Sequence, residues 1–334
     1  VDISPIGDLL KSEVRQMSHE LGILSELVGA IPTDGLWSDN RTDEQAIGNP
    51  YKNGNIELCC VVAFNALACE IFKLTNDLKI ADFLELSLYN AVMGSFSPTG
   101  RWSTYNTPME GIKCANYHSI GFQCRPGSPE LNCCSVNAPR GVGMLSEWAF
   151  MQDNGTVYIN YLERCSFEAE EGLKIEIDGE YPAKGTVQIR IKSKESQMIA
   201  IRIPAWSKKT EVIFENKSIS ADAGQYLYIK KQWDNELLSV KLDFSPRLVE
   251  GAGEQQGKKC IYAGPILYGY DLGINTFNII DDLPTISEKE VMNAAPARCK
   301  NGKIVLELKS GIILSDFYRL GNSGAQYKTW FKFK

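Results

Sequence analysis

The chain has 334 residues, of which 44% are hydrophobic and 23% charged, and its formal net charge at pH 7 is -6. This length exceeds one ordinary hydrophobic core, so we expect two domains. Charges of one sign form no long block, which argues against nucleic acid as a partner. No apolar run approaches the roughly 20 residues of a membrane helix. We therefore expect a soluble protein without a membrane span, from a bacterial cytoplasm or periplasm.

The beginning of the chain lacks the features of a translation start. It opens at Val1 and continues into Ser4-Pro5-Ile6-Gly7 without a charged and then apolar signal pattern. We expect either a processed protein or a fragment.

Apolar residues recur at helical spacing in the first 150 residues, and two long loops separate them. This periodicity predicts helices over 8–28, 61–72, 76–88 and 136–151. The run over 61–72 is apolar around much of its circumference, as expected of a helix packed on more than one side. The loop over 94–132 is rich in Gly, Pro, Ser and Asn, and ordered loops of this length are usually functional.

The pattern changes to period two after the turn residues Asp153-Asn154-Gly155. Short alternating segments then follow with turns between them, which is typical of an antiparallel β-sandwich. The predicted strands are 157–161, 174–177, 187–191, 199–204, 211–215, 226–230, 238–244, 259–262 and 304–308. We therefore expect an α + β multidomain protein with a helical domain over 1–152 and a β-sandwich over 153–334.

Cysteines provide the strongest chemical signal. Glu57-Leu58-Cys59 lies at a predicted helix start, and Cys133-Cys134 precedes the helix expected near Val136. Three thiols and one carboxylate suit a tetrahedral zinc ion, and the positive end of a helix dipole favours anionic ligands there. The sequence therefore predicts a zinc site formed by Glu57, Cys59, Cys133 and Cys134.

Other interpretations of these cysteines stay open at this point. Adjacent cysteines are often small buried hydrophobic residues, and four protein ligands are the usual mark of a closed, purely structural zinc. A different ligand set could draw on Cys114, His118 and Cys124. Spacing alone does not decide between these possibilities.

Several motifs resemble one family, glycoside hydrolase family 127 (the former DUF1680 proteins), typified by β-L-arabinofuranosidases. The resemblance covers nearly the whole chain, and the combination of Glu-x-Cys with Cys-Cys-x-x-Asn is specific. The matching segments are 35–38 with 43–45, 55–59, 132–140, 201–206, 246–249 and 262–268.

The resemblance implies a retaining glycosidase with part of an (α/α)6 barrel followed by the sandwich. Cys133 would be the nucleophile, Glu44 the acid/base, and the four-residue set above would hold zinc. The substrate would be a carbohydrate, a β-L-arabinofuranoside or related sugar.

The sequence departs from the family at Gln45, after Glu44, and in the 94–132 loop, and one further departure is serious: about four helices are predicted before the sandwich, too few for the barrel. Half a helical ring would expose a large apolar face. We therefore expect a second polypeptide to complete the barrel. The alternative from another class is a non-catalytic carbohydrate-binding or scaffold protein with a structural zinc.

Overall fold

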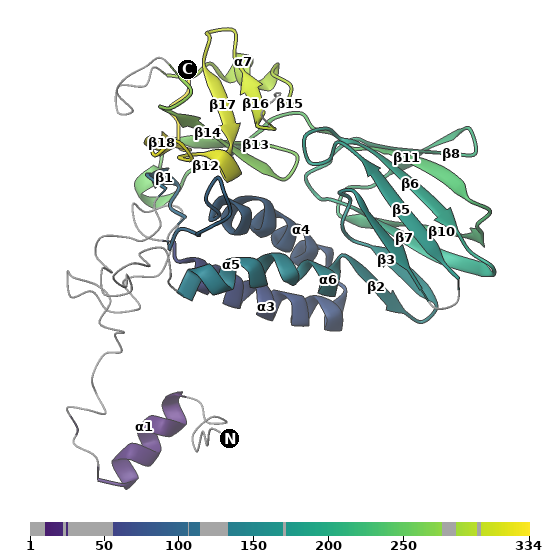
Figure 1. Ribbon diagram of the computed structural model, residues 1–334, viewed down its shortest axis with the longest axis horizontal. Helices are drawn as coiled ribbons and strands as arrows, with labels where there is room; N and C mark the ends of the chain where they lie inside the picture. The colour runs from purple at the N-terminus through teal and green to yellow at the C-terminus, as the bar shows by residue number, and fades with distance from the viewer. Residues whose placement is uncertain are drawn as a thin grey trace. The chain divides into compact units, whose positions relative to one another are not determined.

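The structure is a computed structural model, shown in Figure 1. It describes residues 11–22, 25, 56–105, 107–113, 133–169, 172–275, 285–298 and 302–334. The chain divides into two compact units, Val1–Ile47 and Gly48–Lys334. Within the first unit, the structure describes helix α1 (Lys11–Glu20), which lies inside the helix expected over 8–28.

The helical part of the second unit packs three segments side by side. They are α3 (Leu58–Thr75), α4 (Leu78–Ser87) with its π-helical continuation η1 (Leu88–Val92), and α5 (Cys133–Gly143) with the short α6 (Leu145–Trp148). Asp77 caps α4, because its carboxylate accepts a hydrogen bond from Lys79 N at 2.9 Å. These elements confirm the helices expected over 61–72 and 76–88.

The helix expected over 136–151 has different bounds. It begins at Cys133, so both cysteines of the pair lie in its first turn rather than before it, and α6 ends at Trp148. Strand β2 (Phe150–Asp153) follows, and the Phe150 ring stacks on Phe167 with centroids 4.8 Å apart. Pairing and stacking with distant strands override the local helical pattern at this end.

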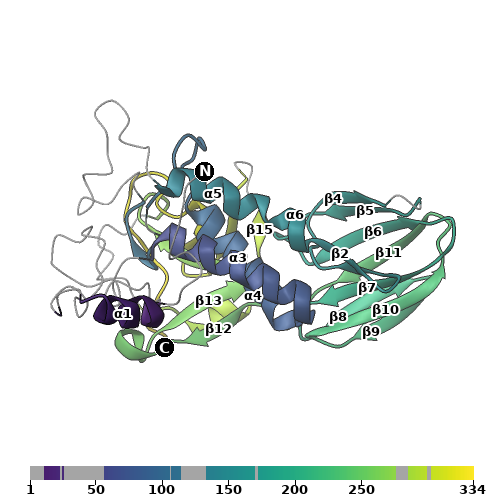
Figure 2. The same cartoon turned by 90° about the horizontal axis from the view of Figure 1, so that it is seen from below.

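A glycine allows α5 to approach its neighbours closely. A Cβ atom at Gly141 would lie 2.8 Å from Val92 Cγ1 and 3.1 Å from Val62 Cγ2. No side chain fits there without a shift of η1 or α3. α5 therefore packs directly against α3, and Figure 2 shows the two helices from below.

Two sheets form the sandwich that follows. The four-stranded sheet has the order β10-β7-β3-β2 and the six-stranded sheet the order β4-β5-β6-β11-β8-β9. Their further strands are β3 (Thr156–Ile159), β4 (Cys165–Glu168), β5 (Lys174–Gly179), β6 (Thr186–Lys192), β7 (Ser196–Ile203), β8 (Thr210–Phe214), β9 (Lys217–Ala221), β10 (Gln225–Gln232) and β11 (Glu236–Lys241). Alternate residues such as Ile175, Ile189 and Ile201 are fully buried, which is the period-two pattern predicted for a sandwich.

One strand pair departs from the antiparallel expectation. β3 pairs with β7 in parallel, with Val157 opposite Ile199. The connection between them passes through the second sheet, β4 to β6, and a crossover of this kind returns the chain in the same direction. A period-two pattern gives no information about strand direction.

A buried ion cluster joins the sandwich to the helices. Arg202 on β7 is fully buried and contacts Asp82 Oδ1 at 2.6 Å and Glu85 Oε2 at 2.7 Å, both on α4. Tyr181 and Trp206 also donate hydrogen bonds to the Glu85 carboxylate. Each charge therefore has several partners, as burial of charge requires.

A third sheet, of eight strands, contains the end of the chain. Its path is β1-β18-β14-β17-β16-β15, with β13 pairing to β14 and β12 to β13. The strands are β1 (Glu110–Gly111), β12 (Arg247–Glu250), β13 (Lys259–Ala263), β14 (Ile266–Asp271), β15 (Ala297–Arg298), β16 (Ile304–Glu307), β17 (Ile313–Asp316) and β18 (Tyr327–Lys328), with short helical segments η3 (Gly253–Gln255), α7 (Glu288–Met292) and η4 (Phe317–Arg319). Because β1 follows α4 in the chain, this sheet is tied to the helical region. The domain division at residue 152 stays a prediction.

The packing at Gly141 yields a prediction about stability. Gly141→Ala should lower the free energy of unfolding by about 1–3 kcal/mol, because the added methyl group overpacks the contact with Val62 and Val92. Gly143→Ala is the matched control, since a Cβ there meets nothing within 4 Å and alanine favours the helix. Thermal or urea unfolding of both variants measures the difference. Equal stability of the two variants would show that the contact of Gly141 with Val62 and Val92 has room for a methyl group.

Candidate metal and active site

The structure brings the four predicted metal ligands together. One potential ligand atom from each of Glu57, Cys59, Cys133 and Cys134 lies within 4.8 Å of all the others. Two come from the start of α3 and two from the first turn of α5, 74 or more positions further along the chain. The fold therefore joins two sequence motifs that spacing alone could not connect.

Backbone pairing fixes the start of α3. Leu58 N donates to Tyr105 O at 3.1 Å, and Thr107 N donates to Ile56 O at 2.9 Å. Glu57 lies between these bonds as the N-cap residue, and its side chain makes no capping hydrogen bond to the helix. The carboxylate is thus positioned at the cluster by its backbone and is not used as a helix cap.

The sulfur atoms have different surroundings. Cys59 Sγ lies 3.4 Å from Cys134 Sγ and accepts a hydrogen bond from Asn137 Nδ2 at 3.2 Å. Cys134 is fully buried, and its thiol contacts Tyr105 O at 3.6 Å. Cys133 is the exposed member of the cluster. One thiol therefore faces outward while its neighbour in the sequence faces the core.

These contacts make the thiols unequal as acids. Hydrogen bonding from Cys134, and further from Cys133 and Asn137, lowers the pKa of Cys59 to about 7 despite partial burial. Burial and the nearby Cys59 raise the pKa of Cys133 to about 11. The hydrogen bond to Cys59 and then burial raise the pKa of Cys134 above its usual range. Without a metal ion, these contacts therefore favour ionisation of the Cys59 thiol and oppose ionisation of Cys133 and Cys134.

The donor set fits zinc. In a tetrahedral site with Zn–S bonds of about 2.3 Å, sulfur atoms lie about 3.8 Å apart, close to the 3.4 Å between Cys59 and Cys134. Three thiolates and a carboxylate crowded together would repel one another, and a bound dication removes this repulsion. Soft sulfur ligands favour zinc over magnesium or calcium.

Other predicted site residues lie outside the described part of the chain. They are Glu44, the acid/base that the resemblance implies, and the alternative ligands Cys114, His118 and Cys124. Two neighbours of the cluster had no such role in the sequence analysis: Tyr105, whose carbonyl contacts both halves, and Asn137. The Cys-Cys-x-x-Asn spacing was a signal for Asn137, because residues i and i+4 share one helix face.

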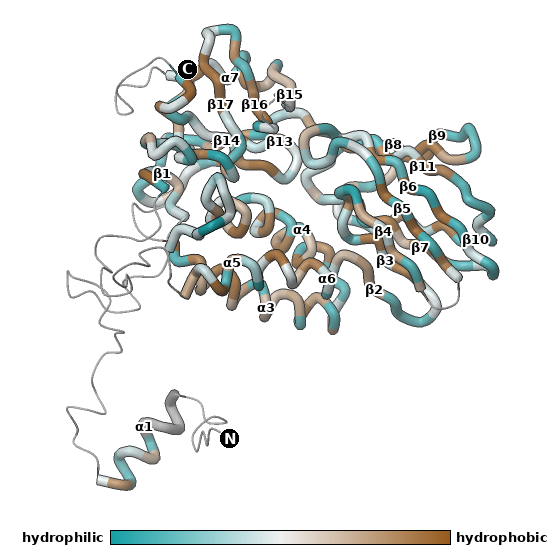
Figure 3. The backbone as a smooth tube through the Cα atoms, viewed as in Figure 1, coloured by the Kyte–Doolittle hydropathy of each residue, from teal (hydrophilic) through white to brown (hydrophobic). Residues whose placement is uncertain are grey.

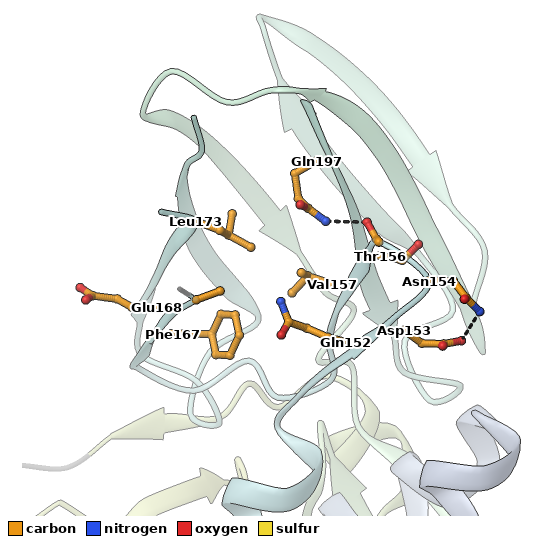
Figure 4. Close-up of a pocket in the computed structure, with 11 residues that line it drawn as sticks. Gln152, Asp153, Asn154, Thr156, Val157, Phe167, Glu168, Leu173 and Gln197 are labelled. Carbon is orange, nitrogen blue, oxygen red and sulfur yellow. Dashed lines mark hydrogen bonds between the residues drawn. The ribbon is translucent and has the colours of Figure 1, made fainter. Parts of the chain in front are cut away.

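A separate cavity of about 600 Å³ lies at one end of the sandwich. Figure 4 shows the apolar side chains of Val157, Phe167 and Leu173 and the amides of Gln152 and Gln197 around it. Gln197 Nε2 is held by Gly155 O at 2.6 Å. Its described lining includes neither cysteine nor histidine, so it is distinct from the thiol cluster.

Comparison with known proteins connects these features to one class, the glycoside hydrolases. Residues 35–147 match the family model described as "Beta-L-arabinofuranosidase, GH127 catalytic domain". Residues 156–245 match "Beta-L-arabinofuranosidase, GH127 middle domain". The first match contains all four residues of the cluster and the second contains most of the sandwich. The chain belongs to glycoside hydrolase family 127.

Solved structures share this fold. A GH127 β-L-arabinofuranosidase from Geobacillus stearothermophilus T6 superposes with a TM-score of 0.72 at 16% identity, covering 97% of this chain and 59% of that one. A second GH127 β-arabinofuranosidase gives a TM-score of 0.70 at 17% identity, with the same coverage. A structure described as a glycoside hydrolase gives 0.69 at 20% identity, over 86% of this chain and 54% of that one. The chain thus spans less than two thirds of the length of these proteins.

A short segment is similar to a different kind of protein. The NH(3)-dependent NAD(+) synthetase of Methanococcoides burtonii is 48% identical over 52 residues, which are 16% of this chain and 19% of the synthetase. The synthetase of Carboxydothermus hydrogenoformans is 40% identical over 53 residues, 16% of this chain and 21% of that enzyme. The similarity is confined to about one fifth of those enzymes.

The role of Asn137 can be tested through metal affinity. Asn137→Leu should weaken zinc binding about 10- to 100-fold, because the amide that orients Cys59 Sγ is lost. Asn293→Leu is the matched control, since Asn293, the C-cap of α7, donates to Lys289 O at 2.7 Å as Asn137 donates to Cys133 O at 3.2 Å. Competition with a chromogenic chelator measures both affinities. Unchanged zinc affinity in Asn137→Leu would show that the Asn137 amide does not contribute to metal binding.

Proposed function

We propose that this protein is a retaining glycoside hydrolase with Cys133 as its nucleophile and a β-L-arabinofuranoside or related sugar as its substrate. The observation that carries the proposal is the different exposure of adjacent ligands: Cys133 is exposed whereas Cys134 is completely buried. A nucleophile must reach the substrate, and a permanent ligand need not. The family membership and the sugar named for its solved members support the substrate class.

The proposed reaction proceeds through two displacements. Cys133 Sγ attacks the anomeric carbon and forms a C–S bond as the C–O bond to the leaving group breaks, while Glu44 donates a proton to the departing oxygen. Glu44, now a carboxylate, then takes a proton from water, which attacks the same carbon and breaks the C–S bond. Two inversions give retained configuration, and the thiolate and the acid are both restored.

We propose zinc as the cofactor, held by Glu57, Cys59, Cys133 and Cys134. When bound, it would keep the coordinating thiols deprotonated at neutral pH, which Cys133 requires because its own pKa is raised to about 11. Cys59 and Cys134, held by Asn137 and Tyr105, would remain as anchors while Cys133 reacts.

We also propose that a second polypeptide completes the helical barrel around this site. The chain spans 59% of the length of the solved GH127 enzyme from G. stearothermophilus, and that whole enzyme is the molecule named as an arabinofuranosidase.

Cys133→Ser should reduce hydrolysis of chromogenic β-L-arabinofuranosides to background, because a serine hydroxyl at this position is neither a thiolate nor a good zinc ligand. Cys60→Ser, at an exposed cysteine of α3, should retain activity. Hydrolysis assays, together with zinc determination and iodoacetamide labelling of Cys133, distinguish a nucleophile from a purely structural zinc ligand. Zinc at full occupancy, with Cys133 inert to label and no hydrolysis of any α- or β-arabinofuranoside by the wild type, would favour a binding or scaffold protein with structural zinc.

Glu44→Gln should lower turnover about 10²- to 10⁴-fold, the usual contribution of a general acid, with zinc content unchanged. The greatest loss should occur with substrates whose leaving groups need protonation. Glu20→Gln, at an exposed carboxylate on α1, is the control. Unchanged turnover in Glu44→Gln would contradict this role and move the acid/base to another carboxylate.

A further inference from the structure

Two hairpin turns hold the cavity at one end of the sandwich in shape. Asn154 and Gly155 form the β2–β3 turn and have positive φ, 46° and 73°, as the tight two-residue turn between twisted strands requires. Ala169 N donates to Leu173 O at 2.9 Å and closes the β4–β5 hairpin. Both hairpins contribute residues to the cavity lining. Backbone pairing therefore fixes both sides of the cavity.

Two glutamines of the four-stranded sheet occupy positions that face the sandwich core. Gln152 pairs with Val157, and Val157 pairs with Ile199, so these side chains lie on one face of the sheet. Gln197 lies two positions before Ile199 and shares that face. Val157 and Ile199 are fully buried, which identifies this face as the core side. At the cavity, the core side thus changes from aliphatic to amide side chains, as Figure 4 shows.

The six-stranded sheet contributes an aromatic wall. Phe167 pairs with the fully buried Ile175, and Leu173 lies two positions before Ile175 on the same face. One face of the Phe167 ring stacks on Phe150, with centroids 4.8 Å apart and planes 13° from parallel. Phe150 thereby fixes the ring and covers one of its faces, so the opposite face is the one left for a ligand in the cavity.

The two amides have hydrogen-bonding capacity left for a ligand. Gln197 Nε2 donates to Gly155 O at 2.6 Å and to Met198 O at 3.4 Å, and these bonds orient the amide. Among the described residues, none donates to Gln197 Oε1 and none bonds the Gln152 amide. A glutamine amide offers two donors and a carbonyl acceptor, which together match the donor and acceptor of a hydroxyl group.

The charges around the cavity favour an uncharged ligand. The described lining contains two carboxylates, Asp153 and Glu168, and no Lys, Arg or His. A phosphate, sulfate or uronic acid would therefore meet negative charge without a counter-charge. A purely apolar ligand would instead bury the glutamine amides without partners, which is costly. An uncharged ligand with several hydroxyl groups and an apolar face suits both constraints.

We propose that this cavity is a carbohydrate-binding site on the sandwich, separate from the thiol cluster, for a neutral sugar residue of the glycan substrate. The inference rests on the proposed function, which supplies the substrate class. A sugar ring has a C–H surface for Phe167 and hydroxyl groups for the amides of Gln152 and Gln197. The cavity volume of about 600 Å³ lies within the range of about 300–1,000 Å³ of small-molecule sites. A glycan held here would raise the local concentration of its remaining sugars around the same chain.

The test titrates the full chain with a β-L-arabinofuranosyl trisaccharide, follows the side-chain amide signals of Gln152 and Gln197 by NMR and measures Kd by calorimetry. We expect both signals to shift on binding. Gln152→Ala with Gln197→Ala should weaken binding at this site at least tenfold, because both amides are lost. Gln225→Ala with Gln232→Ala, on β10, is the matched control, since Gln232 Nε2 likewise donates to a carbonyl, Lys194 O at 2.8 Å, outside the cavity lining. A trimer of galacturonic acid should bind at least tenfold more weakly than the neutral trisaccharide.

Three results would overturn the proposal: no shift of either amide signal at millimolar trisaccharide, an equal loss of affinity in the cavity and β10 variants, or equal affinity for the galacturonic acid trimer. If the cavity double variant fails to fold, the amide shifts of the wild type and the single variant Gln152→Ala, at an exposed position, decide the question. Hydrolysis of chromogenic arabinofuranosides is scored separately. Sugar binding at the cavity without hydrolysis refutes the enzyme and leaves this site standing, whereas hydrolysis without the amide shifts refutes this site alone.

Discussion

Gly141 lets α5 lie against Val62 of α3 and Val92 of η1 at a distance that no other residue would permit without a shift. The cysteine pair lies two turns earlier on α5, and Cys59 lies one turn before Val62 on α3. Because both helices are stiff over such short lengths, the contact at Gly141 also sets the separation of their first turns. The 3.4 Å between Cys59 and Cys134 is thus a consequence of helix packing as much as of the thiols themselves.

A second set of contacts connects the sandwich to the helices that carry the candidate site. Arg202 is buried against Asp82 and Glu85, and removal of one partner from such a cluster usually costs about 3–5 kcal/mol. α4 is in turn packed against α3, whose first turn carries Glu57 and Cys59. The sandwich therefore stabilises the helical layer through α4, and α5 packs against α3 and η1 of the same layer at Gly141.

The sequence predicted most of the helices and strands but few of the pairings between segments that are distant in the chain. The helices expected over 61–72 and 76–88 and the alternation at Ile175 and Ile189 follow from periodicity, and each appears in the structure. The parallel pairing of β3 with β7 and the strand at Phe150 depend on partners 42 and 9 residues away, which no local pattern specifies.

The candidate site was also only partly predictable from the sequence. The spacing of its cysteines indicated metal chemistry, and the fold joined its two halves. The carbonyl of Tyr105 could not be found from sequence, because any residue type supplies a carbonyl and its position depends on the backbone path. The Asn137 amide could be found in principle, since helical spacing places it beside Cys133.

α3 contributes both to the candidate site and to the helical core. Cys59 lies in its first turn and Glu57 is its N-cap, while Leu58, Val62 and Phe72 of the same helix are fully buried. Figure 3 shows the apolar colouring along α3. A metal ion held by Glu57 and Cys59 would therefore be linked to the order of this first turn, because a ligand that binds only the folded state stabilises that state.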